Sequence, residues 1–583
     1  MATSIVDPET LLAVDIGSVH TRAVLFDVVE GRYEVVALGV APTTAQAPWN
    51  DVREGVVQAV EQVQRITGRA LLGGGGELLT GSQVDGEGVD RVVITLSAGR
   101  PLQVICVGAL QSISLDSARR LAESTYAELV RLFHLNDRLT PEERLNKMVL
   151  SRPDLIILAG GTDGGAVQSV LSLVENVGLA AYLAPTQHKP LVFYVGNQAL
   201  VPKVRELLEP LTGLVVAPNV RPTLDTERLL VGHHELVEAF RLLRRGQMRG
   251  LDDLMEVARG HLWPTATAFG RMVRYLSRLY GGEKGVLGVD VGASATTLAA
   301  AWQGQRMTLK VYPSLGLGER LDSLLRHTPL QSIARWLTID LDDDDVVDYL
   351  YTKATYPESV PMTEEELQVE QALGRQLLRL AVRQAYADFP QAFWQPQRAL
   401  PLFEPVMLSG SLFTRAPHPA QTVLLALDGL QPIGVTTLVL DQNHLLPMLG
   451  AAAEMNPYLS VQVLESPHFL PLATVVAPVW RGGFGRPVLR VQVETGEGKP
   501  RQVELKGGAL EVIPIPLGTQ ARVTLRPASG VDVGRGPGRG YTFQAAGTHL
   551  GLVLDGRGRP LRLPADRERR HQLYRLWWSK IRD

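Results

Sequence analysis

The chain has 583 residues, of which 45% are hydrophobic and 20% are charged. This composition is typical of folded globular proteins and excludes disordered, collagen-like and coiled-coil chains, and a single core rarely exceeds about 250–300 residues, so we expect several domains. The 58 basic and 61 acidic side chains give a net charge of −3, which provides no global attraction to nucleic acid or anionic lipid, so neither partner is expected.

The single cysteine, Cys106, excludes an internal disulfide and a cysteine-built zinc site, and its apolar neighbours predict a buried thiol. The N-terminus lacks the basic segment and following apolar segment of a signal peptide, and no apolar run reaches the roughly 18 residues of a membrane span. We therefore expect a cytoplasmic protein.

The opening of the chain predicts a strand, a turn and a second strand. Apolar runs at 11–14 and 21–26 flank the polar segment Asp15-Ile-Gly-Ser18. A third predicted strand follows at 33–38, and valines at helical spacing predict a helix over 50–66.

Further along, short apolar runs alternate with helical segments, which is typical of an α/β domain with a largely parallel sheet. The predicted strands lie near 91–97, 103–109, 155–159, 191–195 and 214–217. The third of these ends in the glycine-rich turn Gly160–Gly165, for which two interpretations stay open. It is a switch loop or partner-facing loop, or it is a tight strand-to-helix turn with Asp163 as the helix cap. We assign residues 1–230 to this first domain.

Residues 231–284 predict a helical connection, after which the opening pattern returns. The segments 285–293 and 296–302 again predict a strand, a turn and a strand, with Asp290 at the bend. This repetition predicts two topologically similar halves that arose by internal duplication, the second one spanning 285–460.

From 461 to 583, alternating runs separated by Gly and Pro turns predict a small β domain. The chain ends in a predicted basic helix with two tryptophans, which we expect to dock on this domain or on a protein rather than on nucleic acid or a membrane. The segment 534–540, rich in Gly and Arg, is interpreted as a β loop, and the acidic run 340–345 as a solvated loop or helix cap.

The first Asp-x-Gly turn has the residue types of a phosphate site. A glycine at position 17 lets the backbone bend and approach a phosphate, and successive N–H groups of such a turn attract anions. Ser18 and Thr21 add hydroxyl donors. Asp15, at a strand end, is placed to hold the waters of a Mg²⁺ ion.

A second turn of the same kind, at Asp290, strengthens this hypothesis, because two hairpins from two domains can clamp the phosphates of one nucleotide. A third element, the strand end and glycine turn at 406–411, can lie under adenosine. The candidate magnesium residues, acting through water, are Asp15 and Asp290. The candidate nucleotide-binding residues are Asp15, Gly17, Ser18, Thr21, Asp290, Gly292, Ala293, Ser294, Thr296, Thr297, Gly410 and Ser411.

This order of motifs resembles the superfamily of actin, heat-shock chaperones and sugar kinases, where the three elements are called phosphate-1, phosphate-2 and adenosine motifs. The resemblance implies an α/β, actin-like ATPase fold of two ribonuclease-H-like domains, to which this chain adds the C-terminal β-rich domain and the terminal basic helix.

More narrowly, the chain resembles the glutamate mutase accessory family, usually called MutL or GlmL and unrelated to the mismatch-repair protein. The resemblance covers about residues 11–455. The matching segments are Val14–Ser18 with Thr21, Ala41–Thr44, Ser97–Gly99 with Val107-Gly108, Asp154–Gly165, Tyr194–Asn197, Ala217–Val220 with Pro222, and Gly288–Gly292.

Members of that family are associated with adenosylcobalamin-dependent mutases as ATP-dependent chaperones or reactivases, which release a damaged cofactor. The resemblance therefore implies ATP or ADP with Mg²⁺ as ligands and a protein, such as a cobalamin-dependent mutase, as partner. It implies no action on a small metabolite.

The sequence departs from the family pattern at three positions. Ala293 replaces the second glycine of the second turn, Leu298 stands where a later aspartate falls, and Ser411 replaces the second glycine of the adenosine motif. Because no general base is evident, weak chaperone-type ATP hydrolysis stays open, and the catalytic residues are unknown. Two alternatives also stay open, a degenerate scaffold that forms filaments or other assemblies and a small-molecule kinase, as does a homo-oligomeric state.

Overall fold

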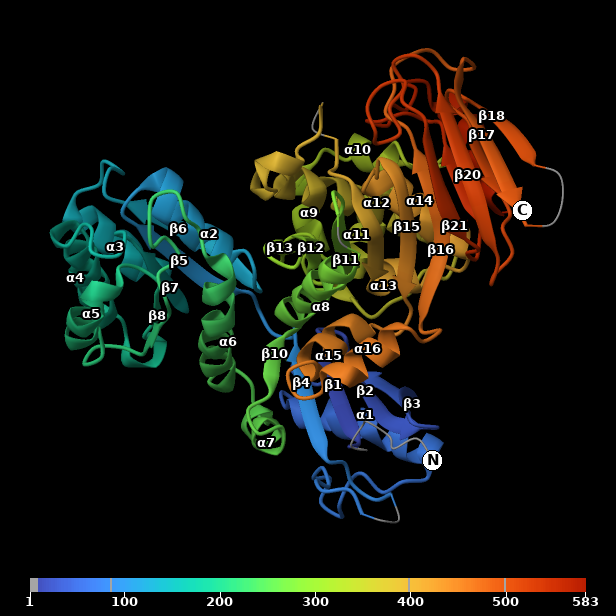
Figure 1. The fold of residues 1–583 in the computed structure, drawn as a ribbon. Coiled ribbons are helices and arrows are strands. Elements are labelled where there is room, and N and C mark those ends of the chain that lie inside the picture. The colour runs from blue at the N-terminus through green and yellow to red at the C-terminus, as the bar shows by residue number, and fades with distance from the viewer. Residues whose placement is uncertain (1–8, 84–85, 281, 397–398, 497–499, 583) are drawn as a thin grey trace. The chain divides into compact units, whose positions relative to one another are not determined.

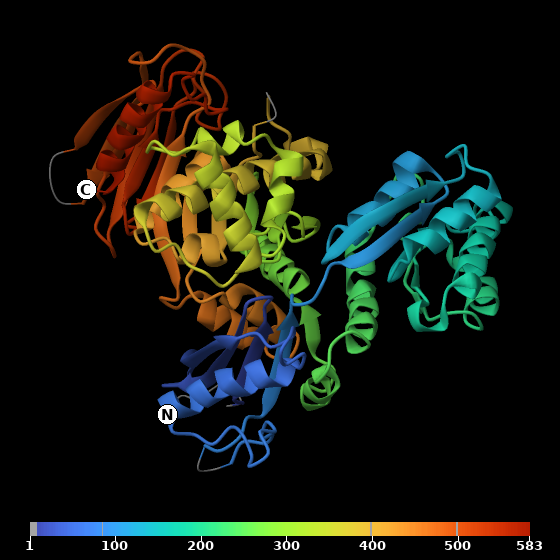
Figure 2. The same ribbon diagram turned by 180° about the vertical axis from the view of Figure 1, so that it is seen from behind.

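The computed structural model describes residues 9–83, 86–280, 282–396, 399–496 and 500–582 (Figures 1 and 2). The chain divides into two compact units. Unit 1 comprises Met1–Phe269, Leu309–Pro313 and Pro447–Gln462, and unit 2 comprises Gly270–Thr308, Ser314–Leu446 and Val463–Asp583.

The first sheet of unit 1 is mixed, with the strand order β10-β4-β1-β2-β3. Strands β1, β2 and β3 are antiparallel neighbours, whereas β4 runs parallel to both β1 and β10. Helix α1 (Val52–Thr67), capped by Asp51, packs on β2 and β3 with its valine face buried. The strands are β1 (Leu11–Ile16), β2 (His20–Val29), β3 (Arg32–Pro42), β4 (Arg91–Leu96) and β10 (Leu262–Pro264).

Unit 1 contains a second, wholly parallel sheet with the order β6-β5-β7-β8-β9. Its strands are β5 (Leu102–Gly108), β6 (Ala127–His134), β7 (Leu155–Ala159), β8 (Leu191–Tyr194) and β9 (Leu214–Val216). Its helices are α2 (Asp116–Ala122), α3 (Pro141–Ser151), α4 (Gln168–Leu183), α5 (Val201–Leu208) and α6 (Leu229–Arg245). The chain adds β6 on one side of β5 and then β7, β8 and β9 on the other side. This is the strand order of a doubly wound sheet with its switch point between β5 and β7. Cys106 is buried in β5, as expected.

The alternating pattern predicts all these strands in one domain, whereas the structure separates them into two sheets. An apolar run shows that a strand is buried but not which sheet it joins, so the alternation alone does not reveal the separation. The segment 231–284, expected to be a helical connection, holds α7 (Leu251–Val257) and α8 (Thr265–Leu279), and it also supplies β10 to the first sheet.

The large sheet of unit 2 has the order β13-β12-β11-β14-β15-β16-β22-β19. Its first five strands repeat the order of the first sheet, with β11 antiparallel to β12 and parallel to β14. The chain therefore has two similar halves and the actin-like α/β fold. The five strands are β11 (Gly285–Val291), β12 (Thr296–Trp302), β13 (Arg306–Tyr312), β14 (Phe403–Ser409) and β15 (Gly434–Asp441).

Helices follow between and after these strands. They are α9 (Leu324–His327), α10 (Gln331–Ala334), α11 (Asp343–Thr355), α12 (Glu364–Ala385), α13 (Ser411–Thr414), α14 (Pro419–Gly429), α15 (Leu445–Ala452) and α16 (Pro457–Leu464). The acidic run caps α11, because Asp342 and Asp345 form a reciprocal capping box at its start. The helix-cap interpretation of this run is confirmed.

The C-terminal region is β-rich, as expected, but three of its strands, β16, β22 and β19, belong to the large sheet. The other four form a sheet with the order β18-β17-β20-β21. The strands are β16 (Phe469–Ala477), β17 (Pro487–Thr495), β18 (Arg501–Lys506), β19 (Leu510–Ile513), β20 (Gln520–Pro527), β21 (Tyr541–Ala546) and β22 (Leu552–Asp555). A shared core that includes Val435 of β15 and Val523 of β20 joins the two sheets.

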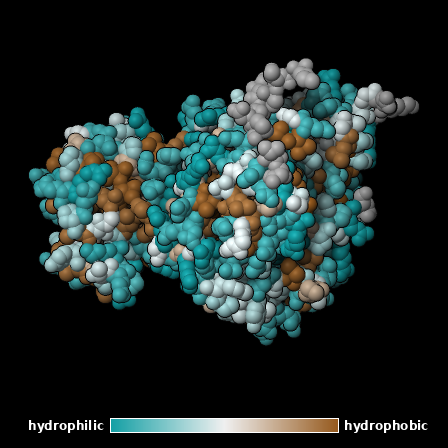
Figure 3. All heavy atoms as spheres, turned by 90° about the horizontal axis from the view of Figure 1, so that it is seen from below, coloured by the Kyte–Doolittle hydropathy of each residue, from teal (hydrophilic) through white to brown (hydrophobic). Residues whose placement is uncertain are grey.

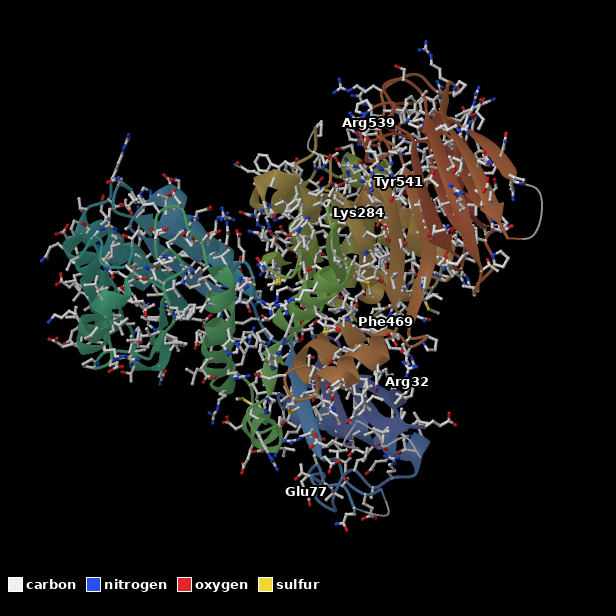
Figure 4. The ribbon with its side chains drawn as sticks, viewed as in Figure 1. Arg32, Glu77, Lys284, Phe469, Arg539 and Tyr541 are labelled. Atoms are coloured by element: carbon white, nitrogen blue, oxygen red, sulfur yellow. The ribbon has the colours of Figure 1, made fainter. Side chains whose placement is uncertain are left out.

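The segment 534–540 is a loop between β20 and β21, as interpreted. Asp532 holds it by accepting hydrogen bonds from the backbone N–H groups of Gly534, Arg535 and Gly536. The Arg535 guanidinium lies 4.6 Å from the ring centroid of Tyr541, which is labelled in Figure 4.

The terminal helix α17 (Arg567–Arg582) docks on unit 2, as expected. It buries Tyr574, Trp577 and Ile581, and the Trp577 indole donates to the Gly508 carbonyl at 2.9 Å. Hydrophilic residues cover most of the face drawn in Figure 3. No helix in the described part of the chain is both long enough and apolar enough to cross a membrane.

Candidate functional site

The first hairpin, β1–β2, holds Asp15 at a fixed place in unit 1. Asp15 pairs across the antiparallel ladder with Arg22 and, on its other side, with Thr95 of the parallel strand β4. The carboxylate is buried, and its Oδ1 accepts hydrogen bonds from the hydroxyls of Thr95 (2.7 Å) and Thr265 (3.1 Å). The Arg22 guanidinium lies 3.6 Å from Oδ2. Asp15 is therefore oriented by two donors and partly neutralised by one cation.

The turn of this hairpin closes on itself. The Gly17 N–H donates to the His20 carbonyl at 3.0 Å, and a Cβ on Gly17 would lie 2.7 Å from that oxygen. Thr43 donates to the Gly17 carbonyl at 2.8 Å and shares a hydrogen bond with Thr21 at 2.9 Å. The Thr21 side chain is buried, so its hydroxyl supports the turn from inside, while Ser18 is partly exposed.

The second hairpin, β11–β12 in unit 2, has the same register. Asp290 pairs with Thr297 across the antiparallel ladder and with Ser409 of the parallel strand β14. The Gly292 N–H donates to the Ala295 carbonyl at 3.0 Å. Asp290, Thr296 and Thr297 are buried, and the Thr296 hydroxyl donates to the Leu315 carbonyl. Ser294, like Gly292 and Ala293, has its place in the turn between the two strands.

The segment that follows β13 packs on this turn. The Leu317 N–H donates to the Gly292 carbonyl at 3.0 Å. A Cβ on Gly318 would lie 2.7 Å from the Ala293 carbonyl oxygen and 2.9 Å from the Ala293 methyl group. Ala293 stands where the family pattern has a glycine, and its methyl group has room because it lies against Gly318.

The glycine turn after β14 lies directly against the second hairpin. Gly410 has a φ of +90°, and a Cβ there would lie 2.4 Å from the Val291 carbonyl and 2.5 Å from Asp290 Oδ1. Ser411 begins α13. The structure thus brings together the residues predicted for the second half of the site.

Sequence reasoning missed a polar cluster beside Asp290. His444 Nδ1 lies 3.0 Å from Ser409 Oγ and 3.7 Å from Asp290 Oδ1, and Ser409 Oγ lies 3.3 Å from Asp441 Oδ2. Asp441 accepts hydrogen bonds from the first two N–H groups of α15, at Leu445 (2.8 Å) and Leu446 (2.9 Å). Burial raises the pKa of the Asp441 carboxyl. The sequence signal for this cluster is limited to the polar residues at the ends of two strands, β14 and β15, of which only β14 is predicted from the sequence.

In the second sheet, the segments that resemble the family meet at the carboxyl ends of the strands. Asp163, in the glycine turn after β7, accepts hydrogen bonds from Asn219 Nδ2 (2.9 Å) and the Gln198 N–H (3.1 Å). Asn197 Oδ1 accepts one from the Gly164 N–H at 3.2 Å. Helix α4 is capped at Val167, so the expectation that Asp163 caps it is wrong. Asp163 instead joins the ends of three strands.

No group of three or more His, Cys, Asp or Glu side chains that could hold a metal occurs in the part of the chain that the structure describes. A Mg²⁺ ion near Asp15 would meet a carboxylate whose Oδ1 already accepts two hydroxyls. That geometry fits contact through water better than direct ligation, in line with the reluctance of Mg²⁺ to lose its hydration.

Comparison with known proteins gives a family match. The model of the MutL protein family matches residues 11–467. A curated protein from Clostridium tetanomorphum, "Protein MutL", is 23% identical over 491 residues, which are 78% of this chain and 98% of that protein.

Solved structures resemble the chain only distantly. The ethanolamine utilization protein EutJ from Carboxydothermus hydrogenoformans is 11% identical, with a TM-score of 0.27 over 77% of this chain and 90% of that one. A glycerol dehydratase reactivase is 12% identical, with a TM-score of 0.27 over 72% and 94%. Xylulose kinase from Bifidobacterium adolescentis is 10% identical, with a TM-score of 0.28 over 78% and 93%. Similarities of this size say nothing about function.

Proposed function

Because the chain belongs to the MutL family, we propose that it is an actin-like ATP-binding protein that acts on a protein partner. One observation carries the proposal. Each half ends its first strand with a buried aspartate, Asp15 or Asp290, opposite a hydroxyl residue of the next parallel strand and just before a glycine turn. Two such turns in one duplicated fold suit a ligand with several phosphates.

In this proposal both hairpins contact the same nucleotide. The turn N–H groups around Gly17 and Gly292 bind phosphate oxygens, and Gly410 with Ser411 lies under adenosine. Asp15 and Asp290 hold waters of a Mg²⁺ ion, which would neutralise part of the phosphate charge. The hydroxyls of Thr95 and Thr265 orient Asp15 for this task.

Among the boundaries between the units, one falls inside α8, after Phe269, and another falls inside α15, after Leu446. These helices touch closely within unit 1, because a Cβ on Gly450 would lie 2.0 Å from the Ala268 carbonyl. We propose that a change at either hairpin is passed along these helices. Thr265, which begins α8, donates to Asp15, and Asp441 caps α15.

We propose an adenosylcobalamin-dependent mutase as the partner, with nucleotide binding used to release its damaged cofactor. The test is recovery of activity by such a mutase after inactivation of its cofactor. The chain with Mg-ATP should restore activity when intact cofactor is supplied, and the Asp290→Asn variant should not. Equal recovery with and without the chain would refute the partner and leave nucleotide binding to be judged separately.

A further inference from the structure

Unit 2 contains a cavity that the nucleotide proposal does not use. The cavity has a volume of about 740 Å³ and lies among α10, the second half of α12, the end of α14 and the Arg559-Pro560 segment of the C-terminal region. This volume is within the roughly 300–1,000 Å³ of sites for small organic ligands and far exceeds what a single inorganic ion needs.

The cavity is lined by positive charge. Arg335, Arg379, Arg383 and Arg559 line it together with His327, and none of the described lining residues is Asp or Glu. Arg559 is already paired with Asp555 at 2.6 Å. The other three guanidinium groups make no hydrogen bond or ion pair within the part of the chain that the structure describes.

Two of these arginines are held close together. The guanidinium groups of Arg335 and Arg379 each lie 5.6 Å from the ring centroid of Trp336, which is buried. Burial and the nearby charge of Arg335 lower the pKa of Arg379. The like charges of the two arginines repel each other, so an anion that contacts both would be bound favourably.

The remaining lining suits an organic group. Leu380, Leu400 and Leu430 are buried and line the cavity beside the rings of Tyr386 and Trp394, whose centroids lie 5.6 Å apart. Amide side chains add polar partners, among them those of Gln376 and Gln431. The site therefore offers both cations and a flat apolar surface.

This cavity is distinct from the candidate nucleotide site. Leu400 lies just before β14 begins at Phe403, and the strand ends at Ser409, next to Gly410. Seven extended residues at about 3.3 Å each place the two ends of β14 roughly 20 Å apart. A ligand in the cavity would therefore lie at the opposite end of β14 from Gly410.

We propose that this cavity binds a small organic anion. Its phosphate or carboxylate groups are held by Arg335, Arg379 and Arg383, and its flat or apolar part packs on Tyr386 and Trp394. Guanidinium groups form bidentate hydrogen bonds with both phosphates and carboxylates. The expected ligands therefore share an acidic group attached to an organic body.

The test uses the full chain and three probes, measured by calorimetry and by thermal unfolding. Phenyl phosphate and phthalate separate an aryl phosphate from an aryl dicarboxylate, and inorganic pyrophosphate lacks the organic body. We expect one aryl probe to bind more tightly than pyrophosphate. Arg379→Ala and Arg383→Ala should each weaken that binding about tenfold or more, whereas Arg326→Ala, on the exposed side of α9, should leave it unchanged.

Failure of all three probes to bind at about 10 mM would overturn the proposal, as would equal binding by all the variants. Arg383 is exposed, so its substitution keeps the test valid even if Arg379→Ala unfolds the chain. The Asp15→Asn variant should bind the probe normally, and a loss of binding there would place the probe at the nucleotide site and also overturn the proposal.

Discussion

In the first half Asp15 faces two threonine hydroxyls and an arginine, whereas in the second half Asp290 faces His444, which is backed by Ser409 and Asp441. The strand register is the same in both. Duplication has therefore kept the backbone and the hydroxyl residue of the neighbouring parallel strand, but not the charges. One half fixes its aspartate with neutral donors and an arginine, and the other places a histidine beside it, backed by a serine and a second carboxyl group.

The glycines of the two turns differ in how closely the backbone packs against them. A Cβ on Gly17 would lie 2.7 Å from the His20 carbonyl, whereas a Cβ on Gly292 would find nothing closer than the Ala295 carbonyl at 3.8 Å. The fold itself requires a glycine in the first turn but not in the second. A need for Gly292 would therefore come from a ligand.

The largest effect on stability is expected at the glycine turn of the second half. Gly410→Ala should lower the free energy of unfolding by about 2–4 kcal/mol, because it combines a positive φ with a contact of 2.4 Å to the Val291 carbonyl. Denaturant unfolding measures this. The neighbouring Ser411→Ala is the control, and a loss below about 1 kcal/mol at position 410 would contradict the geometry.

The next effect tests the neutral donors of the first half. Thr95→Val keeps the shape but removes a hydrogen bond to the buried Asp15 carboxylate, so we expect a loss of about 1–3 kcal/mol in the free energy of unfolding. Ser409→Ala, at the matching register position, should cost less, because Asp441 keeps its two backbone donors. Equal losses at the two positions would show that the halves do not differ in this respect.

A smaller contrast is expected between the two turn glycines. Gly17→Ala should destabilise the chain by about 1–2 kcal/mol, and Gly292→Ala by less than about 0.5 kcal/mol, because only the first adds a close contact. Thermal and denaturant unfolding of both variants provide the comparison. A clear destabilisation by Gly292→Ala would mean that this turn is tighter than its contacts indicate.

The smallest effect is a dependence on pH in the second half. Burial raises the pKa of Asp441 above its ordinary value of 3.8, so the folded chain binds a proton that the unfolded chain has released. The contribution of this group to stability should therefore fall as the pH rises from about 4 through the raised pKa, and then level off. Asp441→Asn should remove that slope, which unfolding of both proteins from about pH 4 to about pH 7 would reveal. If the free energies of unfolding of the unchanged chain and of Asp441→Asn varied with pH in parallel, the prediction would be wrong.

The two hairpins could be predicted because both halves place an Asp-x-Gly turn between apolar runs, a local pattern that survives duplication. The residues that surround each aspartate could not be predicted. Ser409, Asp441 and His444 lie at or just after the ends of β14 and β15, far from Asp290 in sequence. Only the register of β14 beside β11 and β15 brings them to Asp290. The buried position of Thr21 was accessible to sequence reasoning, since it alternates with Arg22 along β2.

The separate doubly wound sheet escaped prediction for a different reason. Its apolar runs are indistinguishable from those of the first sheet, and strand β10, only three residues long and ending in Pro264, gives almost no signal. The docking of α17 was predictable from its tryptophans. The addition of β22 and β19 to the large sheet depends on long-range pairing that no local pattern encodes.

The central claim is that both hairpins serve one nucleotide, and calorimetric titration of Mg-ATP and Mg-ADP into the full chain tests it most directly. We predict one binding site per chain, weakened about tenfold or more by Asp15→Asn and likewise by Asp290→Asn, although the two residues belong to different units. Both variants keep the size of the side chain, and their unfolding curves control for loss of the fold. No binding at about 1 mM nucleotide, or binding that only one substitution weakens, would contradict the claim.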